Sequence, residues 1–215
     1  MKITIITDDI KSWFIPYGTE LLNQLTVLGH QVSYVHSKQE ILEGDVCFIL
    51  SCTKLLENDY LLRNKNNIVV HASDLPAGRG WSPLQWQVME GKDTIPLTMI
   101  EAAAGADEGP YYLKSSIRLD GTELLPEMRN KMALEIIKMC TQYAEQRDKL
   151  MPIEQVGDST FYPRRNNKDD EVDIDKTVRE LFSQLRVADN DRHPLYFYYL
   201  ANKYIIKIYK QTDPK

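Results

Sequence analysis

Two irregular stretches of the sequence contain the residues best suited to catalysis. His71 ends an apolar run and is followed by a loop rich in proline and glycine that continues to Pro83. Further along the chain, Asp107 lies in a second loop between Gly105 and Gly109. An imidazole oriented by a carboxylate is a common general base near neutral pH, because histidine changes its charge in that range. His71 and Asp107 are therefore candidate catalytic residues, and the sequence leaves open whether they meet in space.

The elements around His71 predict a parallel sheet. Apolar runs rich in β-branched residues indicate strands over Lys2–Thr7, Gln31–His36, Asp45–Ser51 and Asn67–His71, and leucines at helical spacing indicate a helix between the first two. Strands that alternate with helices form parallel sheets, and ligands bind beyond the carboxyl ends of such strands. This position at the functional edge makes a catalytic role for His71 as well supported as the structural role that is commoner for a lone histidine.

The remaining sequence predicts an extension beyond this sheet. We expect an α/β fold with a Rossmann-like, mostly parallel sheet, helices on both faces, and a C-terminal helical and β-hairpin extension. Residues 1–125 are predicted to form the catalytic core and residues 126–215 an extension packed on it. The tyrosine-rich hairpin can pair with a second copy to give a homodimer or fold back on its own domain. The further elements expected are helices over Pro83–Gly91, Thr122–Lys149 and Lys176–Arg186, strands over Leu97–Glu101 and Tyr111–Ile117, and hairpin strands over Leu195–Leu200 and Tyr204–Tyr209 around Ala201–Lys203.

Composition and charge argue against several classes of function. The chain has 215 residues and a formal net charge of −5, whereas a protein that binds nucleic acid through phosphates needs a basic face. No apolar run approaches the ~20 residues that span a bilayer and no signal peptide is evident, so a cytoplasmic location without membrane contact is expected. The loop after the first strand contains neither a GxGxxG motif nor a P-loop. The cysteines and histidines lack the spacing of metal ligands, and we predict no metal site.

The two irregular stretches together resemble a known family. The segment His71–Gly80 is similar to the HxSLLPxxxG signature of folate-dependent formyltransferases, which include methionyl-tRNA, glycinamide ribonucleotide and sugar N-formyltransferases. The segment Gly105–Gly109 is similar to the GxDxG loop of that family, at a suitable distance downstream. The resemblance covers residues 1–120 well and the remainder more loosely. The signature positions that match are His71, Ser73, Leu75, Pro76 and Gly80.

The resemblance implies a reaction in which an amine attacks the formyl carbon of N10-formyltetrahydrofolate. His71 would accept the amine proton and help to stabilise the oxyanion, and Asp107 would hold the imidazole. The family's third catalytic residue is an asparagine at the position of Val69, where an amide donor can be worth roughly 3–4 kcal/mol of barrier lowering. Asn67 is a doubtful substitute because it lies ~13 Å from His71 along a strand. Ser51 as donor, a larger role for His71, and loss of activity are the alternatives.

The same resemblance implies the residues that contact the two substrates. Arg164, Arg165 and Arg186 could bind a diphosphate, since guanidinium groups match phosphate geometry, and Trp13 could stack on a base or sugar. Pairing of the arginines with the acids of Asp169–Asp175, and burial of Trp13 as a core residue, are the competing interpretations. The predicted formyl-donor contacts are Ser51, Leu75, Pro76, Arg79, Gly80 and Asp107, and the predicted acceptor contacts are Trp13, Arg164, Arg165, Arg186 and Asn190.

Elimination among the family's acceptors favours a nucleotide sugar. The transfer-RNA enzymes carry a further C-terminal domain and a basic face, and the purine-pathway enzymes hold a phosphate with a glycine-rich loop after the first strand. Phe161–Arg165 and Leu185–Asn190 are also similar to segments of sugar formyltransferases. The expected acceptor is a UDP- or dTDP-linked 4-amino-4,6-dideoxy sugar used for a surface polysaccharide. Formylation of a carrier-bound aminoacyl group, and a non-catalytic module that binds folate or nucleotide, remain the alternatives.

Overall fold

The computed structural model describes residues 1–211, and its centre is a six-stranded mixed sheet. The strand order is β2-β1-β3-β4-β6-β7, in which the first four strands are parallel and β6 and β7 run antiparallel to their neighbours. This arrangement confirms the predicted Rossmann-like, mostly parallel sheet. The strand bounds are β1 Lys2–Ile6, β2 Gln31–Val35, β3 Gly44–Ile49, β4 Asn64–His71, β6 Thr94–Glu101 and β7 Tyr111–Arg118.

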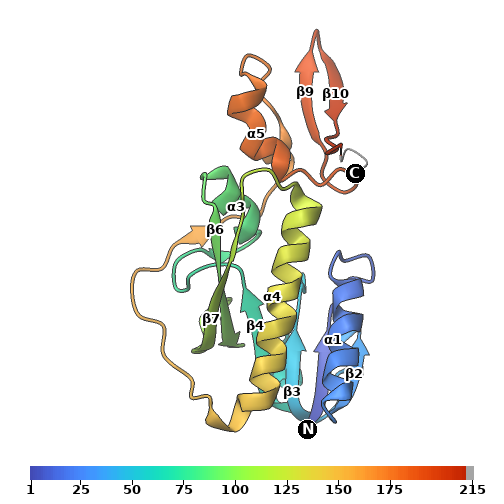
Figure 1. Cartoon of the computed structure of the whole chain (residues 1–215), viewed down its shortest axis with the longest axis vertical. Helices are drawn as coiled ribbons and strands as arrows, with labels where there is room; N and C mark the ends of the chain where they lie inside the picture. Colours follow the sequence, from blue (N-terminus) through green and yellow to red (C-terminus); the bar gives the residue numbers. More distant parts are fainter. Residues whose placement is uncertain (212–215) are drawn as a thin grey trace.

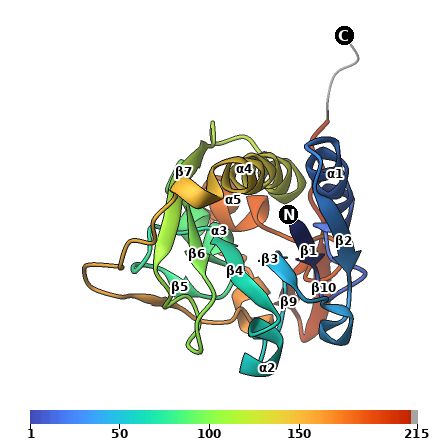
Figure 2. The same cartoon turned by 90° about the horizontal axis from the view of Figure 1, so that it is seen from below.

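The two faces of the sheet are covered unequally. Helices α1 (Ile15–Val27) and α4 (Leu125–Gln146) lie side by side on one face (Figures 1 and 2). The main core lies beneath them and includes Ile5, Phe48 and Tyr143, all of which are almost fully buried. The other face carries the single-turn helix α2 (Asn58–Leu61) over a smaller apolar cluster (Figure 2).

Local sequence signals explain where the helices begin. Each of α1, α3 (Pro83–Met89) and α4 has a proline in its first two positions, where the missing N–H costs no hydrogen bond and the fixed φ suits the helix. Helix α5 (Val178–Arg186) begins instead with a capping box, in which the Thr177 hydroxyl accepts from the Glu180 N–H and the Glu180 carboxylate accepts from the Thr177 N–H. Within residues 1–211, no helix is both long enough and apolar enough to cross a bilayer.

The C-terminal part forms a smaller layer above the end of the sheet (Figure 1). Helix α5 and the hairpin of β9 (Leu195–Tyr199) and β10 (Asn202–Ile206) enclose their own apolar cluster. The hairpin turn was predicted at residues 201–203, and this is wrong by one residue. Leu200 and Ala201 have positive φ values of 46° and 62° and form the turn, whereas Asn202 already belongs to β10. A two-residue hairpin loop needs positive φ at both positions, a geometry that asparagine or glycine signals and Leu-Ala does not.

A long connection returns from the base of α4 to the carboxyl end of the sheet. We call residues 150–162 the strap. It pairs with β7 at one bridge, Tyr111 with Ile153, and ends in the short strand β8 (Phe161–Tyr162), which runs parallel to β5 (Arg79–Gly80). In Figure 1 the strap passes outside the β6–β7 edge of the sheet, so that it reaches the loop after His71 from the outside.

Candidate functional site

A cavity of about 610 Å³ opens where the parallel strands end. Its lining includes Ser12 from the loop after β1, Ser51 from the loop after β3, and His71 from the last position of β4. Loop residues Ala102, Ala103 and 105–107 and the α4 residues Met132 and Ile136 complete what we call the inner wall. Concave sites of roughly 300–1,000 Å³ are the usual size for small-molecule ligands. The cavity therefore lies at the sheet edge that the sequence predicts, and its size suits an organic substrate.

His71 and Asp107 meet at this cavity. The His71 side chain is almost buried, its Nδ1 lies 3.4 Å from Asp107 Oδ1, and its Nε2 lies 2.8 Å from the Gly78 carbonyl oxygen. A carbonyl oxygen only accepts hydrogen bonds, so Nε2 donates in this contact. Asp107 can then satisfy a second proton on Nδ1. The pair is thus arranged to hold one additional proton beside the cavity.

The backbone around Asp107 is specialised. Asp107 has a φ of 59°, and its Oδ2 accepts a hydrogen bond of 3.0 Å from the Gly80 N–H. Gly80 itself has a φ of 100°, and a Cβ at this position would lie 2.4 Å from the Tyr162 carbonyl oxygen. Only glycine fits there, because both the positive φ and the closeness of the strap exclude a side chain. Gly80 therefore joins the His71 loop to the carboxylate of Asp107.

Ser51 lies across from His71 at the end of the neighbouring strand. The register of β3 and β4 pairs Ile49 with Val69, and both Ser51, two residues after the end of β3, and His71 line the cavity. Ser51 has a φ of 55°, and its Oγ lies 3.0 Å from Ser12 Oγ. The pair of hydroxyls supplies a donor at the cavity wall. Ser51 is thus a predicted cofactor contact that lines the cavity, and its role as an oxyanion donor stays a prediction.

The two asparagines near Val69 are engaged elsewhere. The Asn67 amide donates to the Leu61 carbonyl, and the Asn66 carbonyl oxygen accepts two hydrogen bonds from the Arg147 guanidinium. Val69 itself lines the cavity with an apolar side chain. Neither amide takes the place of the family asparagine, as the strand spacing predicts for Asn67.

Three predicted donor contacts lie behind the cavity wall instead. Leu75 and Pro76 are buried and do not line the cavity. The Arg79 guanidinium turns away from it, donates to Gln155 Oε1 at 3.0 Å, and faces Glu108. Direct contact of these three residues with the formyl donor therefore stays a prediction that the cavity lining does not support. Their motif positions shape the loop, because an apolar anchor and an arginine bonded to the strap fix its course.

Three of the five predicted acceptor contacts reach the cavity. Trp13, Arg164 and Arg165 all line it. The Arg164 guanidinium lies 4.7 Å from the Trp81 ring centroid, whereas Arg165 is ion-paired with Asp170 at 2.7 Å. Arg164 thus presents its charge from an exposed aromatic platform, and Arg165 is held by a nearly buried carboxylate.

The other two predicted acceptor contacts do not line the cavity and are bonded within the protein. Arg186 is 7% exposed and donates to the Glu123 carbonyl oxygen at 2.8 Å and to Glu123 Oε2 at 3.1 Å. The Asn190 amide group donates to the Ile208 carbonyl and its oxygen accepts from the Ile208 N–H. A guanidinium or amide in the sequence carries no record of its partner, and here both partners are internal. The Arg186 contacts fix the C-terminal layer on the core, and the Asn190 contacts hold that layer together.

Sequence reasoning missed two cavity arginines. Arg129 on α4 pairs with Asp189 at 2.9 Å, and Arg192 pairs with Asp9 at 2.9 Å and donates to the Lys11 carbonyl at 2.7 Å. Arg192 and Asp9 are 183 residues apart in the chain, so local pattern gives no signal for their contact. The cavity lining includes the cations Lys54, Arg129, Arg164, Arg165 and Arg192 and the anions Asp9, Asp107, Asp170 and Asp189. The wall is thus slightly cationic in a chain whose net charge is −5.

No group of histidine, cysteine or acidic side chains within residues 1–211 is arranged to hold a metal ion. The three cysteines are unpaired in the described chain, and burial raises the pKa of the Cys47 thiol to about 12. The polar groups that line the cavity include imidazole, carboxylate, hydroxyl, guanidinium, ammonium and thiol groups.

Comparison with known proteins adds a family to this geometry. A family model described as formyl transferase matches residues 24–141. Methionyl-tRNA formyltransferase of Thermodesulfovibrio yellowstonii is 26% identical over 153 residues, which cover 69% of this chain and 49% of that protein. The chain spans about half the length of the curated relatives it matches.

Solved structures share the fold over the whole chain. Methionyl-tRNA formyltransferase from Clostridium thermocellum has a TM-score of 0.84 at 21% identity and covers 100% of this chain and 95% of that chain. A 4-N formyltransferase from Francisella tularensis has a TM-score of 0.76 at 17% identity and covers 98% of each chain. At these identities the likeness establishes the architecture of the sheet and its C-terminal layer.

Proposed function

The chain belongs to the formyl transferase family, and from this premise we propose that it is an enzyme that transfers a formyl group from N10-formyltetrahydrofolate to an amine. The observation that carries the proposal is the His71–Asp107 pair at the wall of the cavity, with Nδ1 and Oδ1 3.4 Å apart. An amine that becomes an amide must lose a proton. The pair can take it, because the Gly78 carbonyl accepts from Nε2 and the Asp107 carboxylate faces Nδ1.

The cavity fits the formyl donor. Its lining combines apolar side chains, including Ile49, Val69 and Ala102, with the hydroxyls of Ser12 and Ser51. A flat heterocycle needs apolar contact on its faces and hydrogen bonds at its edge, which this combination provides. When bound, N10-formyltetrahydrofolate supplies an activated carbonyl carbon. Ser51 Oγ and the His71 ring would hold the negative charge that develops on the carbonyl oxygen, in the manner of an oxyanion hole.

The proposed acceptor is a UDP- or dTDP-linked 4-amino-4,6-dideoxy sugar. The slightly cationic wall opposite His71 supports it, since Arg164 and Arg165 are guanidinium groups of the kind that bind a diphosphate. Trp13 and Trp81, which also line the cavity, offer surfaces for a base or sugar ring. The likeness to a 4-N formyltransferase over 98% of each chain is consistent with such an acceptor.

An acceptor panel tests this proposal. Purified protein is incubated with N10-formyltetrahydrofolate and, separately, with nucleotide-linked amino sugars, methionyl-tRNA and an aminoacyl carrier protein, and products are identified by mass spectrometry. Formylation of a nucleotide sugar alone supports the proposal. Formylation of methionyl-tRNA or of the carrier-bound group assigns a different acceptor to the same chemistry. Folate binding without turnover on any acceptor would replace the enzyme with a binding module.

A further inference from the structure

One side chain of the strap contacts both loops of the His71–Asp107 site. Gln155 Nε2 donates to the Asp107 carbonyl oxygen at 2.9 Å and to the Gly109 carbonyl oxygen at 2.7 Å. Gln155 Oε1 accepts from Arg79 Nη2 at 3.0 Å. Both amide protons and the amide oxygen are thus used in one cluster of contacts. Gln155 does not line the cavity, so it can act on a substrate only through its partners.

The contacts of Gln155 meet a conformational demand at Asp107. A φ of 59° is uncommon for an aspartate and persists where surrounding contacts determine it. The Gln155 amide holds the Asp107 carbonyl from one side, while the Gly80 N–H holds the Asp107 carboxylate from the other at 3.0 Å. These contacts fix the main chain and the side chain of Asp107 together. The carboxylate is therefore aimed at His71 Nδ1.

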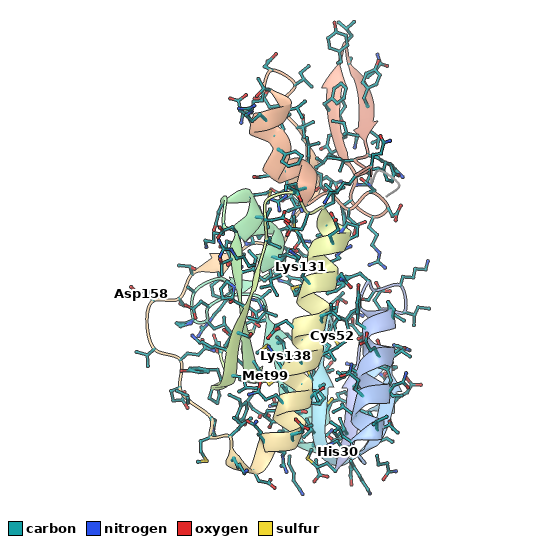
Figure 3. The ribbon with its side chains drawn as sticks, in the orientation of Figure 1. His30, Cys52, Met99, Lys131, Lys138 and Asp158 are labelled. Atoms are coloured by element: carbon teal, nitrogen blue, oxygen red, sulfur yellow. The ribbon has the colours of Figure 1, made fainter. Side chains whose placement is uncertain are left out.

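The strap holds the His71 loop by its backbone as well. The Arg79 N–H donates to the Thr160 carbonyl at 2.9 Å, and the Gly78 N–H donates to Thr160 Oγ1 at 2.8 Å. Gly78 is the residue whose carbonyl accepts from His71 Nε2. The outer bend of the strap at Asp158 points away from the sheet (Figure 3), whereas Gln155 and Thr160 on either side of it bind inward. The strap thus bonds both loops that orient the imidazole.

We propose that Gln155 is a positioning residue, which sets the distance between Asp107 and His71 by fixing the Asp107 backbone. The kinetic consequence rests on the proposed formyl transfer, whereas the geometric consequence does not. Because Gln155 lies outside the cavity, its loss should affect turnover and leave acceptor binding nearly unchanged.

The test compares Gln155→Met and Gln155→Glu with Gln24→Met. Methionine keeps the length of the side chain without donors, and glutamate places a charged oxygen against the two carbonyls. Gln24 lies exposed on α1, where its amide bonds to Glu20 one turn away, so its substitution is the control. We expect kcat to fall by between about tenfold and a hundredfold in both Gln155 variants, the effect of a misplaced catalytic group, with little change in the KM of the acceptor. In an Asp107→Asn background the same substitutions should cost much less.

A second readout separates this inference from the proposed function. The ¹⁵N NMR signals of the His71 ring nitrogens report the partners of Nδ1 and Nε2 without any turnover. We expect Gln155→Met and Asp107→Asn to displace the Nδ1 signal in the same direction and Gln24→Met to leave it in place. If the wild type transfers no formyl group, the proposed function fails and this measurement alone decides the role of Gln155. An unchanged Nδ1 signal, or unfolding of Gln155→Met at the temperature of the measurement, would overturn the positioning role of Gln155.

Discussion

The two walls of the cavity are held by different means. On the inner wall, Asp107 and Ser51 have left-handed backbone conformations, and the contacts of His71 and Asp107 are largely to main-chain groups. We call the lining arginines Arg129, Arg164, Arg165 and Arg192 the outer wall. Three of them, Arg129, Arg165 and Arg192, are each held by an aspartate. Main-chain geometry permits little adjustment, whereas ion pairs can exchange one partner for a ligand. We therefore expect the inner wall to set the rate of the chemical step and the outer wall to set the choice of acceptor.

The largest effects on turnover are expected for His71 and Asp107 on the inner wall. We expect His71→Ala and Asp107→Ala each to lower kcat by about a thousandfold, with acceptor KM nearly unchanged, because a positioned general base contributes 10²–10⁴-fold. Stopped-time assays of formyl transfer measure the effect. The double variant should be little slower than either single variant, because the two residues act as one unit. Additive losses would show that each residue has a separate task.

Substitution of Arg186, which does not line the cavity, should change the stability of the protein and not its turnover. Arg186→Met removes two hydrogen bonds to Glu123, and we expect the free energy of unfolding to fall by about 3 kcal/mol, because bonds of a charged group are lost while Lys131 still pairs with the carboxylate. Chemical denaturation measures the change. Arg179→Met, at an exposed position of the same helix, is the matched control. A large loss of kcat in folded Arg186→Met would mean that this arginine also serves the site.

Variants of Ser51 separate the role of its hydroxyl from the role of its backbone conformation. Removal of an oxyanion donor lowers kcat by about a hundredfold or more, and we expect this for Ser51→Ala. Ser51→Gly removes the same hydroxyl while relieving the left-handed backbone of its side chain. The two variants should be equally slow and differ only in thermal stability. Wild-type turnover in Ser51→Gly would show that the conformation of this residue matters and its hydroxyl does not.

Substitutions on the outer wall should change the KM of the acceptor. We expect Arg164→Ala to raise the acceptor KM by about tenfold at low salt, the weight of one charge-assisted contact, and to leave kcat nearly unchanged. Lys168→Ala removes a nearby cation that does not line the cavity and is the control. The difference between the two should shrink as salt is added. If Arg164→Ala and Lys168→Ala raise the acceptor KM equally, a long-range electrostatic effect and not a contact of Arg164 explains the change.

The smallest expected effect is the pH dependence of thermal stability that comes from two ion-paired carboxylates, Asp189 and Glu123. Burial raises the pKa of Asp189, but the Arg192 backbone N–H and the Arg129 guanidinium outweigh it and hold that pKa below its ordinary value of 3.8. Glu123 is held below 4.5 in the same way, chiefly by Lys131 and the Asp120 N–H against its burial. A depressed carboxylate pKa contributes stability that is complete above the unfolded value and is lost as pH falls through the folded one. Thermal stability should therefore fall from about pH 4.5 downward, with a flatter profile in Lys131→Met, which removes the cation that lowers the pKa of Glu123.

The sequence predicts the inner wall better than the outer one. His71 is the last residue of an apolar run and Gly80 completes a motif, so strand periodicity and spacing suffice to place them. The left-handed Ser51 and Asp107 give no such signal, since neither residue type requires that conformation. Val69 shows that a motif position can change while its neighbours stay, and the Ser12–Ser51 pair offers a donor there.

The outer wall could not be predicted because its residues come from distant segments. Arg186 and Arg129 are both helical arginines, and only the fold shows that the first faces Glu123 inside the protein and the second faces the cavity. Gln155 was overlooked for the same reason, since a glutamine in an irregular segment has no pattern. Side-chain partners at long sequence separation are set by packing, which local propensity does not encode.

The strap also sets the order in which the molecule becomes complete. Gly78 and Thr160 are 82 residues apart, so the loop that orients His71 finds its partner only after the sheet and α4 have been made. Domains fold from the N-terminus as synthesis proceeds, and the sheet can thus form ahead of a working site. Trp86 provides an optical record of this last step, because its indole N–H donates to the Pro163 carbonyl and its ring stacks on Tyr162. In refolding experiments on a variant with Trp13 and Trp81 replaced by phenylalanine, the fluorescence of Trp86 should therefore change after the backbone signal of the sheet.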